Sequence, residues 1–320
     1  MPILAADIGG TSSRLRLVEG SETLDEKDYS SQDYPNLNSI LEHFIEENSA
    51  LELQAACLAV AGPVRDGKAR VTNLPWEVYE SRISEDFSIP QVKIINDFEA
   101  IGYALAILQP DDFYELQVGS PESTGTRALI GAGTGLGVAI VTRCGDRWQV
   151  LPGEGGHVDF APRTTEQQAL LDYLLQQNSR VSVEMLLSGP GLERIYEFIC
   201  TQNGLDPSSA RRTAASISST ALMGRDPLAV KTLEIFVEIY GAQAGNLALT
   251  SLATGGVFIA GGIAPKILSV LKRGEFIERF SDKSPMSDLL RSMPVRVVLN
   301  TRSGLMGAVQ LASELANTST

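Results

Sequence analysis

The stretch Asp7-Ile8-Gly9-Gly10-Thr11 joins an apolar run at residues 3–8 to a run at residues 14–18 in which apolar and charged side chains alternate. A short apolar run predicts a buried strand, and alternation predicts a strand with one buried face. Glycines between two such strands are typical of a hairpin turn. They also let a backbone approach a phosphate closely, because glycine carries no side chain. The stretch therefore predicts an opening β-hairpin whose turn is either plain or phosphate-binding.

A second glycine-rich turn, Gly131-Ala132-Gly133-Thr134-Gly135-Leu136-Gly137, lies between predicted strands at residues 128–130 and 138–141. It is not a Walker loop, since no Gly-Lys-Ser/Thr follows, and its alternate glycines do not match GxGxxG. Alternating glycines with Thr134 favour a turn that exposes several N–H groups to an anion. A purely structural glycine cluster is the other interpretation.

Asn96 and Asp97 lie where a predicted strand at residues 92–95 passes into a predicted helix at residues 98–108. Ligands of open α/β sheets gather at the carboxyl ends of strands. Capping the helix is the common role of an aspartate at such a point. An Asn-Asp pair also suits the binding of a sugar hydroxyl by the amide and the removal of its proton by the carboxylate. The residues alone leave both roles open.

Glu154, His157 and Glu184 form a third polar group. They are either surface side chains or a set of donors and acceptors for sugar hydroxyls, with Glu154 and His157 flanking two glycines in a tight loop. His43 is the only other histidine, which excludes a His-rich metal centre. Gly261 and Gly262 end a predicted buried strand at residues 257–260. There they serve either helix packing or a flat floor for an adenine ring.

Composition limits the class of protein. The 320 residues exceed the usual size of one domain, and the polar stretch at residues 109–125 is the best candidate for a boundary between two lobes. A net charge of -13 disfavours nucleic acid as a partner. No apolar run reaches the roughly 20 residues of a membrane span, and the first residues do not resemble a signal peptide. Three widely spaced cysteines fit a reducing cytoplasm.

Neither glycine-rich turn contains a lysine or an arginine. If the protein binds a nucleotide, backbone N–H groups and a divalent cation must offset the phosphate charge. Mg²⁺ keeps several waters and takes few carboxylates, so Asp7 would hold it through water. Two such turns with an aspartate between them are the layout of a small-molecule kinase. Strand–loop–strand openings with glycines in both halves suggest an internal duplication.

These stretches resemble the bacterial-type glucokinases of the hexokinase–actin–Hsp70 superfamily. The likeness runs over nearly the whole chain and comprises Asp7-Ile8-Gly9-Gly10-Thr11, Ala61-Gly62-Pro63, Thr72-Asn73-Leu74-Pro75-Trp76, Ile95-Asn96-Asp97-Phe98, Gly131-Ala132-Gly133-Thr134-Gly135-Leu136-Gly137, Leu151-Pro152-Gly153-Glu154-Gly155-Gly156-His157-Val158-Asp159-Phe160-Ala161-Pro162, Leu187-Ser188-Gly189-Pro190-Gly191 and residues 255–263. The segment around Glu154 and His157, and the order of the set, are its most specific parts.

The resemblance implies an α/β fold of two actin-like ATPase (ribonuclease H-like) lobes with a cleft between them, each a mixed sheet flanked by helices. We expect a small α/β lobe at residues 1–108, completed by a C-terminal helix at residues 300–320, and a large α+β lobe at residues 109–299. The implied reaction is the ATP-dependent phosphorylation of D-glucose at its 6-hydroxyl to give glucose 6-phosphate and ADP. A cytoplasmic homodimer is also implied.

The resemblance also implies roles for single residues, with Asp97 as the general base. The sugar-binding residues would be Asn96, Gly135, Glu154, His157 and Glu184. The nucleotide-binding residues would be Asp7, Gly9, Gly10, Thr11, Gly133, Thr134, Gly261 and Gly262, with Asp7 also holding Mg²⁺ through water.

The chain departs from the family in one respect, because Ser12 and Ser13 follow the Gly-Gly-Thr where the family often has Asn. The Cys-rich zinc motif and the helix-turn-helix of the related repressor–kinases are missing, so neither zinc nor DNA binding is implied. Three alternatives stay open: a kinase for another hexose, such as mannose or an N-acetylated amino sugar; a sugar-binding regulator without catalysis; and an actin-like filament or chaperone ATPase.

Overall fold

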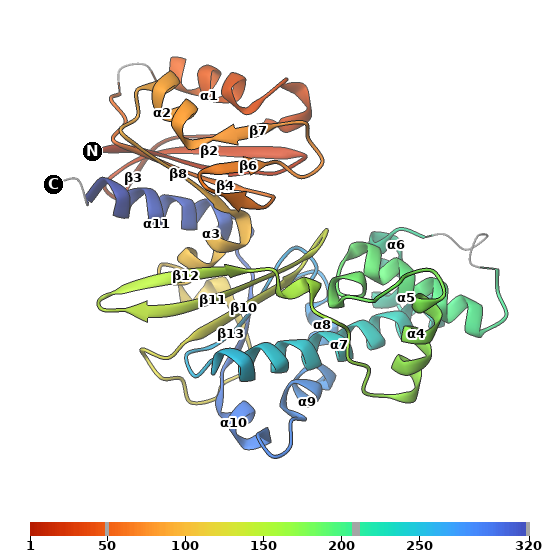
Figure 1. The fold of residues 1–320 in the computed structure, drawn as a ribbon. Helices are drawn as coiled ribbons and strands as arrows, with labels where there is room; N and C mark the ends of the chain where they lie inside the picture. The colour runs from red at the N-terminus through yellow and green to blue at the C-terminus, as the bar shows by residue number, and fades with distance from the viewer. Residues whose placement is uncertain (49–50, 207–211, 318–320) are drawn as a thin grey trace. The chain divides into compact units, whose positions relative to one another are not determined.

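The computed structural model describes residues 1–48, 51–206 and 212–317. The chain divides into two compact units (Figure 1). Unit 1 comprises Met1–Pro110, Trp148–Pro152 and Asn300–Thr320, and unit 2 comprises Asp111–Arg147 and Gly153–Leu299. Each is a mixed sheet with helices packed on it. Within the described residues, no helix combines the length and the apolar character of a membrane span.

Unit 1 is built on a five-stranded sheet in the order β3-β2-β1-β4-β8. Its strands are β1 (Pro2–Ile8), β2 (Ser12–Glu19), β3 (Glu22–Ser30), β4 (Ala55–Val60) and β8 (Gln91–Asn96). β1 and β2 form the predicted antiparallel hairpin. β4 and β8 run parallel to β1. The register sets Ile8 beside Val60 and Val60 beside Asn96, so the turn after β1 and the start of the helix after β8 lie at the same sheet edge.

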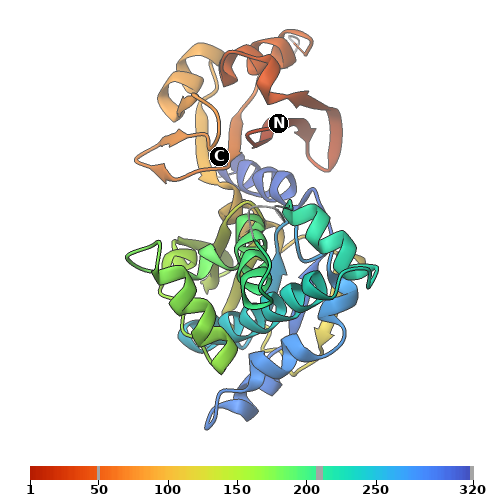
Figure 2. The same ribbon diagram turned by 90° about the vertical axis from the view of Figure 1, so that its right-hand side faces the viewer.

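Helices cover both faces of this sheet (Figures 1 and 2). They are α1 (Leu37–Glu46), α2 (Glu80–Phe87), α3 (Asp97–Ala104) and α11 (Ser303–Asn317), and a small sheet of β5 (Val64–Arg65), β6 (Lys68–Arg70) and β7 (Glu77–Tyr79) lies beside them. On one face, Ile40, Leu41 and Phe44 of α1 enter the core. On the other, Ala308 and Ala312 of α11 pack on β1 and β4. The predicted helix at residues 98–108 ends early, at Ala104.

The small residues of α11 let it lie very close to α3. A Cβ placed on Gly307 would be 1.7 Å from the Ala100 carbonyl oxygen, so only glycine fits there. This contact fixes the N-terminal turn of α11 beside the edge where β1 and β8 end. The first turn of α11 begins next to Asp7, one of the predicted nucleotide-binding residues.

A six-stranded sheet has the order β12-β11-β10-β13-β14-β9, and its strands lie in unit 2 except for Trp148–Pro152 of β12, which belong to unit 1. Its strands are β9 (Phe113–Gln117), β10 (Arg127–Ala132), β11 (Leu136–Cys144), β12 (Arg147–Gly153), β13 (Gly256–Ala260) and β14 (Val295–Val298). The first five follow the same plan as the sheet of unit 1, with β10 in the place of β1, which supports the suggested duplication. The polar stretch at residues 109–125 contains β9, an edge strand that pairs with β14.

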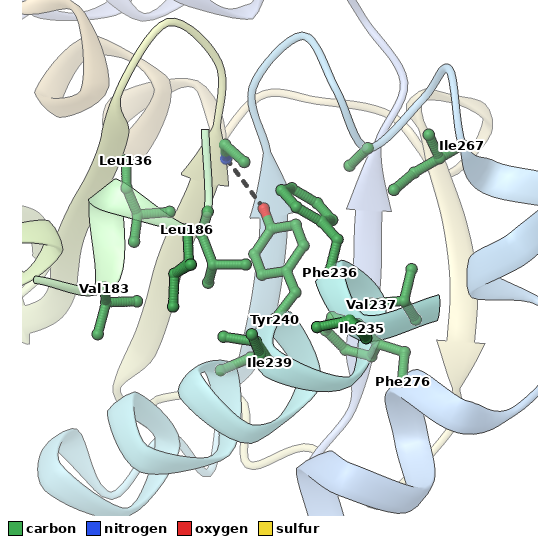
Figure 3. Packing of buried hydrophobic residues seen from close by; sticks show 14 of the residues in the cluster. Leu136, Val183, Leu186, Ile235, Phe236, Val237, Ile239, Tyr240, Ile267 and Phe276 are labelled. Carbon is green, nitrogen blue, oxygen red and sulfur yellow. Dashed lines mark hydrogen bonds between the residues drawn. The ribbon is translucent and has the colours of Figure 1, made fainter. Parts of the chain in front are cut away.

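The helices of unit 2 are α4 (Thr165–Leu175), α5 (Gly189–Gln202), α6 (Ala214–Leu222), α7 (Pro227–Ser251), α8 (Leu268–Leu271), α9 (Glu275–Ser281) and α10 (Ser287–Ser292). The long α7 is buried along much of its length and packs on β10 and α9. Figure 3 shows the ring of Tyr240 among Phe236 and Phe276 in this core. The Tyr240 hydroxyl accepts a hydrogen bond of 3.1 Å from the Ala132 N–H at the end of β10. A buried polar contact therefore anchors the strand that leads into the second glycine-rich turn.

Candidate functional site

The turn at residues 9–11 in unit 1 has its Gly9 and Thr11 carbonyls hydrogen-bonded within the protein. The Gly9 N–H donates to the Ser12 carbonyl at 2.9 Å, and the Thr11 carbonyl accepts from the Ser31 N–H at 3.0 Å. The N–H groups of Gly10 and Thr11 have no acceptor among the described residues. A turn whose Gly9 and Thr11 carbonyls accept from Ser31, and whose Gly10 and Thr11 N–H groups are unused, is suited to bind an anion.

Packing also explains one glycine of this turn. A Cβ on Gly10 would be 2.7 Å from the Thr72 carbonyl oxygen, so the backbone near Asn73 already requires glycine. Close approach of a phosphate is therefore not needed to account for Gly10. Packing against Thr72 and binding of an anion are compatible reasons for Gly10. The Thr72 carbonyl occupies the space where a Cβ would lie, whereas an anion would contact the Gly10 N–H.

Asp97 is the first residue of α3, and the residue before it caps the helix. Asn96 Oδ1 accepts from the Phe98 N–H at 2.8 Å, and Asn96 Nδ2 donates to the Gly62 carbonyl at 3.0 Å. The Asp97 carboxylate shares the Phe98 N–H at 2.9 Å. The capping role proposed for Asp97 thus belongs to Asn96, and the carboxylate of Asp97 is available for other work.

Burial and a neighbouring charge shift the pKa of Asp97 upward. Removal from solvent, reinforced by the nearby negative charge of Asp7, raises the pKa of Asp97 to about 6. Hydrogen bonds from the backbone and from Asn96 act in the opposite direction but are weaker. The group is then mostly ionised near neutral pH and still basic enough to accept a proton, which is what general-base catalysis needs.

Asp7 lies in the same part of unit 1. It is the register partner of Arg14 across the hairpin, and a Cβ on Gly304 at the start of α11 would be 3.1 Å from Asp7 Oδ2. Burial raises the pKa of the Asp7 carboxyl, whereas the charge of Arg14 lowers it. Two neighbouring carboxylates match the oxygen ligands of Mg²⁺, which takes one or two carboxylates and keeps waters, whereas the open backbone N–H groups suit an anion.

In unit 2, the turn at residues 131–137 is held by a carboxylate and by a helix. Glu184 Oε2 accepts from the Leu136 N–H at 2.9 Å, and the Gly133 carbonyl accepts from the Gly189 N–H of α5 at 2.8 Å. Gly133 N–H donates to the Gly135 carbonyl at 2.8 Å. Among the described residues, the N–H groups of Thr134 and Gly135 have no acceptor. This turn therefore repeats the pattern of the first.

Two glycines at this edge are not explained by packing. A Cβ on Gly133 or on Gly262 would meet no described atom within 4 Å, and neither glycine has the left-handed backbone that favours glycine. Gly261 differs, because its φ is +80° and a Cβ there would be 2.5 Å from the Ala132 carbonyl oxygen. Open space over Gly133 and Gly262 is consistent with a ligand that must lie against the backbone.

A backbone hydrogen bond brings together Glu154, His157 and Glu184, the three side chains predicted to bind a sugar. The Val183 N–H donates to the Val158 carbonyl at 2.9 Å, which sets η4 (Val183–Met185) beside η3 (Gly155–His157). The His157 imidazole lies between two carboxylates, 3.8 Å from Nε2 to Glu154 Oε2 and 3.8 Å from Nδ1 to Glu184 Oε1. These distances are too long for hydrogen bonds, so the polar atoms remain available to a ligand.

Exposure distinguishes the members of this group. The side chain of Glu184 is 32% exposed, that of His157 57% and that of Glu154 79%. Glu184 is thus anchored in the protein and Glu154 is open to solvent. Gly156 is buried, and a Cβ on it would be 2.3 Å from the Leu136 carbonyl oxygen. Packing of the loop on β11, rather than wrapping of a polyol, explains this glycine.

The predicted residues fall into two groups, each within one unit. The group in unit 1 comprises Asp7, Gly9, Gly10, Thr11, Asn96 and Asp97, and the group in unit 2 comprises Gly133, Thr134, Gly135, Glu154, His157, Glu184, Gly261 and Gly262. Sequence reasoning missed Tyr240, Ser31 and the start of α11, which support these groups from outside the motifs. Only the aromatic position of Tyr240 in a helical apolar run gave a signal, and that signal indicated core packing.

Comparisons with known proteins agree over nearly the whole chain. The glucokinase family model matches residues 4–315. The chain is 40% identical to the glucokinase of Nostoc punctiforme over 338 residues, which cover 98% of this chain and 99% of the relative.

Solved structures give the same result for the fold. The crystal structure of a glucokinase from an Antarctic psychrotroph has a TM-score of 0.89 and 35% identity, and covers 98% of this chain and 99% of that one. A glucokinase of the ROK family from Streptomyces griseus, in complex with glucose and AMPPNP, has a TM-score of 0.64 and 21% identity, with 98% and 100% covered. These similarities identify the actin-like ATPase fold of sugar kinases.

Proposed function

Because the chain belongs to the glucokinase family, we propose that it transfers the γ-phosphoryl group of ATP to the 6-hydroxyl of D-glucose. The products are glucose 6-phosphate and ADP. The bond between the sugar oxygen and phosphorus forms as the bond between phosphorus and the oxygen of ADP breaks. The observation that carries this proposal is the family match over residues 4–315 together with a tuned carboxylate at Asp97.

Asp97 is the general base of the proposed reaction. Its carboxylate accepts the proton of the attacking hydroxyl, and its place at the end of β8 is held by the cap on α3. The pKa of about 6 supports this role, because a much stronger acid would bind the proton too weakly. Phosphoryl transfer asks the protein mainly for positioning and charge stabilisation.

Backbone N–H groups bind the phosphates in this proposal, with Gly10 and Thr11 in unit 1 and Thr134 in unit 2. Gly9 and Gly133 keep these turns free of side chains, and Gly261 and Gly262 lie beside the adenosine portion. Asp7 holds Mg²⁺ through water. The cation, when bound, supplies the positive charge that the turns lack.

The sugar is bound by Asn96, Gly135, Glu154, His157 and Glu184. Within unit 1 the Asn96 side chain accepts from the Phe98 N–H and donates to the Gly62 carbonyl and to the Asp97 carboxylate, so a sugar hydroxyl would share one of these contacts. Glu184 likewise has one oxygen on the Leu136 N–H and the other directed to His157. These residues therefore hold the sugar with atoms that the protein has already positioned.

We also propose the small lobe at residues 1–108 with residues 300–320, the large lobe at residues 109–299, and a homodimer. A cytoplasmic location is supported by the free thiols of Cys57, Cys144 and Cys200, because a reducing compartment keeps cysteines unpaired. Size-exclusion chromatography with light scattering tests the dimer, since a monomer at micromolar concentration would contradict it.

The proposed reaction is tested by measuring ADP formation with glucose, ATP and Mg²⁺, with mannose, fructose and N-acetylglucosamine in parallel. Turnover of glucose that EDTA abolishes and added Mg²⁺ restores is the expected result. A higher kcat/KM with another hexose would replace glucose as the substrate. Folded protein that turns over no hexose would overturn the reaction, and glucose binding by calorimetry would then separate a regulator from an ATPase of another kind.

A further inference from the structure

A buried chain of hydroxyl groups lies behind the glycine turn of unit 1. Ser13 and Ser31 are both 0% exposed, and their Oγ atoms are 2.8 Å apart. Ser31 Oγ is also 2.8 Å from the Gly9 carbonyl oxygen. Ser13 lies on β2, and Ser31 begins η1 (Ser31–Asp33), so the contacts join two segments to the turn.

The direction of this chain follows from the number of protons. Each serine hydroxyl has one proton to donate, and a carbonyl oxygen can only accept. Ser31 must therefore donate to Gly9, and Ser13 must donate to Ser31. The order Ser13 to Ser31 to Gly9 is the only one that satisfies both contacts.

Ser31 fixes two peptide planes of the turn. Its hydroxyl holds the Gly9 carbonyl, and its N–H holds the Thr11 carbonyl. In a trans peptide the carbonyl and the following N–H point in opposite directions. Holding the Gly9 oxygen toward Ser31 therefore turns the Gly10 N–H away from Ser31, where it has no acceptor among the described residues.

We propose that Ser31 is a positioning residue that presents the Gly10 N–H to a phosphate oxygen of ATP, with Ser13 supporting Ser31 from behind. The inference rests on the proposed function, because it takes the turn at residues 9–11 as the phosphate-binding turn. It also assigns a role to the second serine after Gly-Gly-Thr. Ser13 is internal and acts on the turn through Ser31, whereas Ser12 is exposed.

The test compares Ser31→Ala with Ser13→Ala and with Ser84→Ala as a matched control. Ser84 donates from its hydroxyl to the Ile89 carbonyl at 2.7 Å in unit 1 and does not contact the turn. We expect Ser31→Ala to raise the KM for ATP by about threefold to tenfold, the effect of losing one neutral hydrogen bond. The KM for glucose should stay within about twofold of the parent. Ser84→Ala should leave both constants unchanged.

A double variant separates positioning from stability. Ser31→Ala leaves the Ser13 hydroxyl buried without an acceptor, which lowers the melting temperature. Adding Ser13→Ala removes that orphan group, so the double variant should regain part of the melting temperature. Its KM for ATP should remain as high as in Ser31→Ala, because the Gly9 carbonyl still lacks the hydrogen bond from the Ser31 hydroxyl. Ser13→Ala alone should raise the KM for ATP by less than Ser31→Ala does, because Ser31 can still donate to the Gly9 carbonyl but has lost its support.

Two results would overturn the inference. One is a Ser31→Ala protein that is folded and active with an unchanged KM for ATP. The other is a double variant in which the KM for ATP recovers together with the melting temperature, because the defect would then be structural. If the parent protein does not phosphorylate glucose, the proposed function fails, and ATP affinity by calorimetry on the same variants still decides the role of Ser31.

Discussion

Replacing Asp97 with Asn separates activity from stability. The substitution keeps the shape of the side chain and an oxygen that can accept from the Phe98 N–H, but removes the charge. If Asp97 is the base, kcat should fall by about two to four orders of magnitude. The KM for glucose should change little, because the substitution leaves the other residues proposed to bind the sugar unchanged.

The same substitution should stabilise the protein. The pKa of Asp97 is raised from its usual 3.8 to about 6, so the folded state holds the proton more tightly than the unfolded state. Ionisation then costs the fold free energy as pH rises from about 4 to about 6, and the cost persists above that range. Asn has no such cost, so at pH 7.5 the variant should be more stable by about 1–3 kcal/mol. Below about pH 4 this gain should disappear.

Urea unfolding of both proteins in EDTA at pH 7.5 and at pH 4 measures this difference, and the ADP-coupled assay measures kcat. Asp226→Asn is the matched control. Asp226 caps α7 by accepting from the N–H groups of Leu228 and Ala229, and its carboxylate pairs with Arg212 at 2.6 Å, so Asp226→Asn should lower the unfolding free energy at pH 7.5 and leave kcat unchanged. A kcat for Asp97→Asn within about threefold of the parent would remove Asp97 from the base role. A variant that is less stable at pH 7.5 would refute the electrostatic reasoning.

Further changes test the support of the site. Glu184→Gln should raise the KM for glucose by about 10- to 100-fold, the value of a charged hydrogen bond, in the same kinetic assay. Tyr240→Phe should lower the unfolding free energy by about 1–3 kcal/mol, because it leaves the Ala132 N–H buried without an acceptor. Gly307→Ala should cost at least about 2 kcal/mol through overpacking, measured by urea unfolding. Gly262→Ala has open space and should leave stability unchanged while raising the KM for ATP; an unchanged KM would contradict a ligand over that backbone.

Local sequence signals predicted the parts of the fold that depend on local pattern. The hairpin around residues 9–11 and the passage from strand to helix at Asn96 are both confirmed, because apolar runs and a capping residue act over a few positions. The edge strand β9 was missed. Its residues are at most half-buried, and Glu115 and Gln117 interrupt the aromatic and apolar Phe113, Tyr114 and Leu116, so they do not show the apolar run of a buried strand.

The supports of the site depend on distant residues and could not be predicted in the same way. Ser31 is 18 positions from Ser13, and Tyr240 is 108 positions from the N–H that it holds. A serine in a polar stretch gives no pattern by which its partner can be inferred. The reason for Gly10 was also hidden, because the carbonyl that excludes a side chain comes from Thr72.

The two glycine turns reach the same outcome by different means. In unit 1, neutral hydroxyls and amides hold the carbonyls inward. In unit 2, the carboxylate of Glu184 holds the turn through Leu136, and a Cβ on Gly135 would be only 2.6 Å from Glu184 Oε2. A phosphate cannot share that side of the turn with a carboxylate, because like charges repel at short range. We therefore infer that a phosphate would lie against Gly133 and Thr134, while Gly135 and Glu184 would contact the sugar. One side chain then fixes the turn for ATP and binds glucose, so Glu184→Ala should disturb both substrates. Glu184→Gln keeps an oxygen for the Leu136 N–H and should disturb mainly glucose, whereas Ser31→Ala should disturb only ATP.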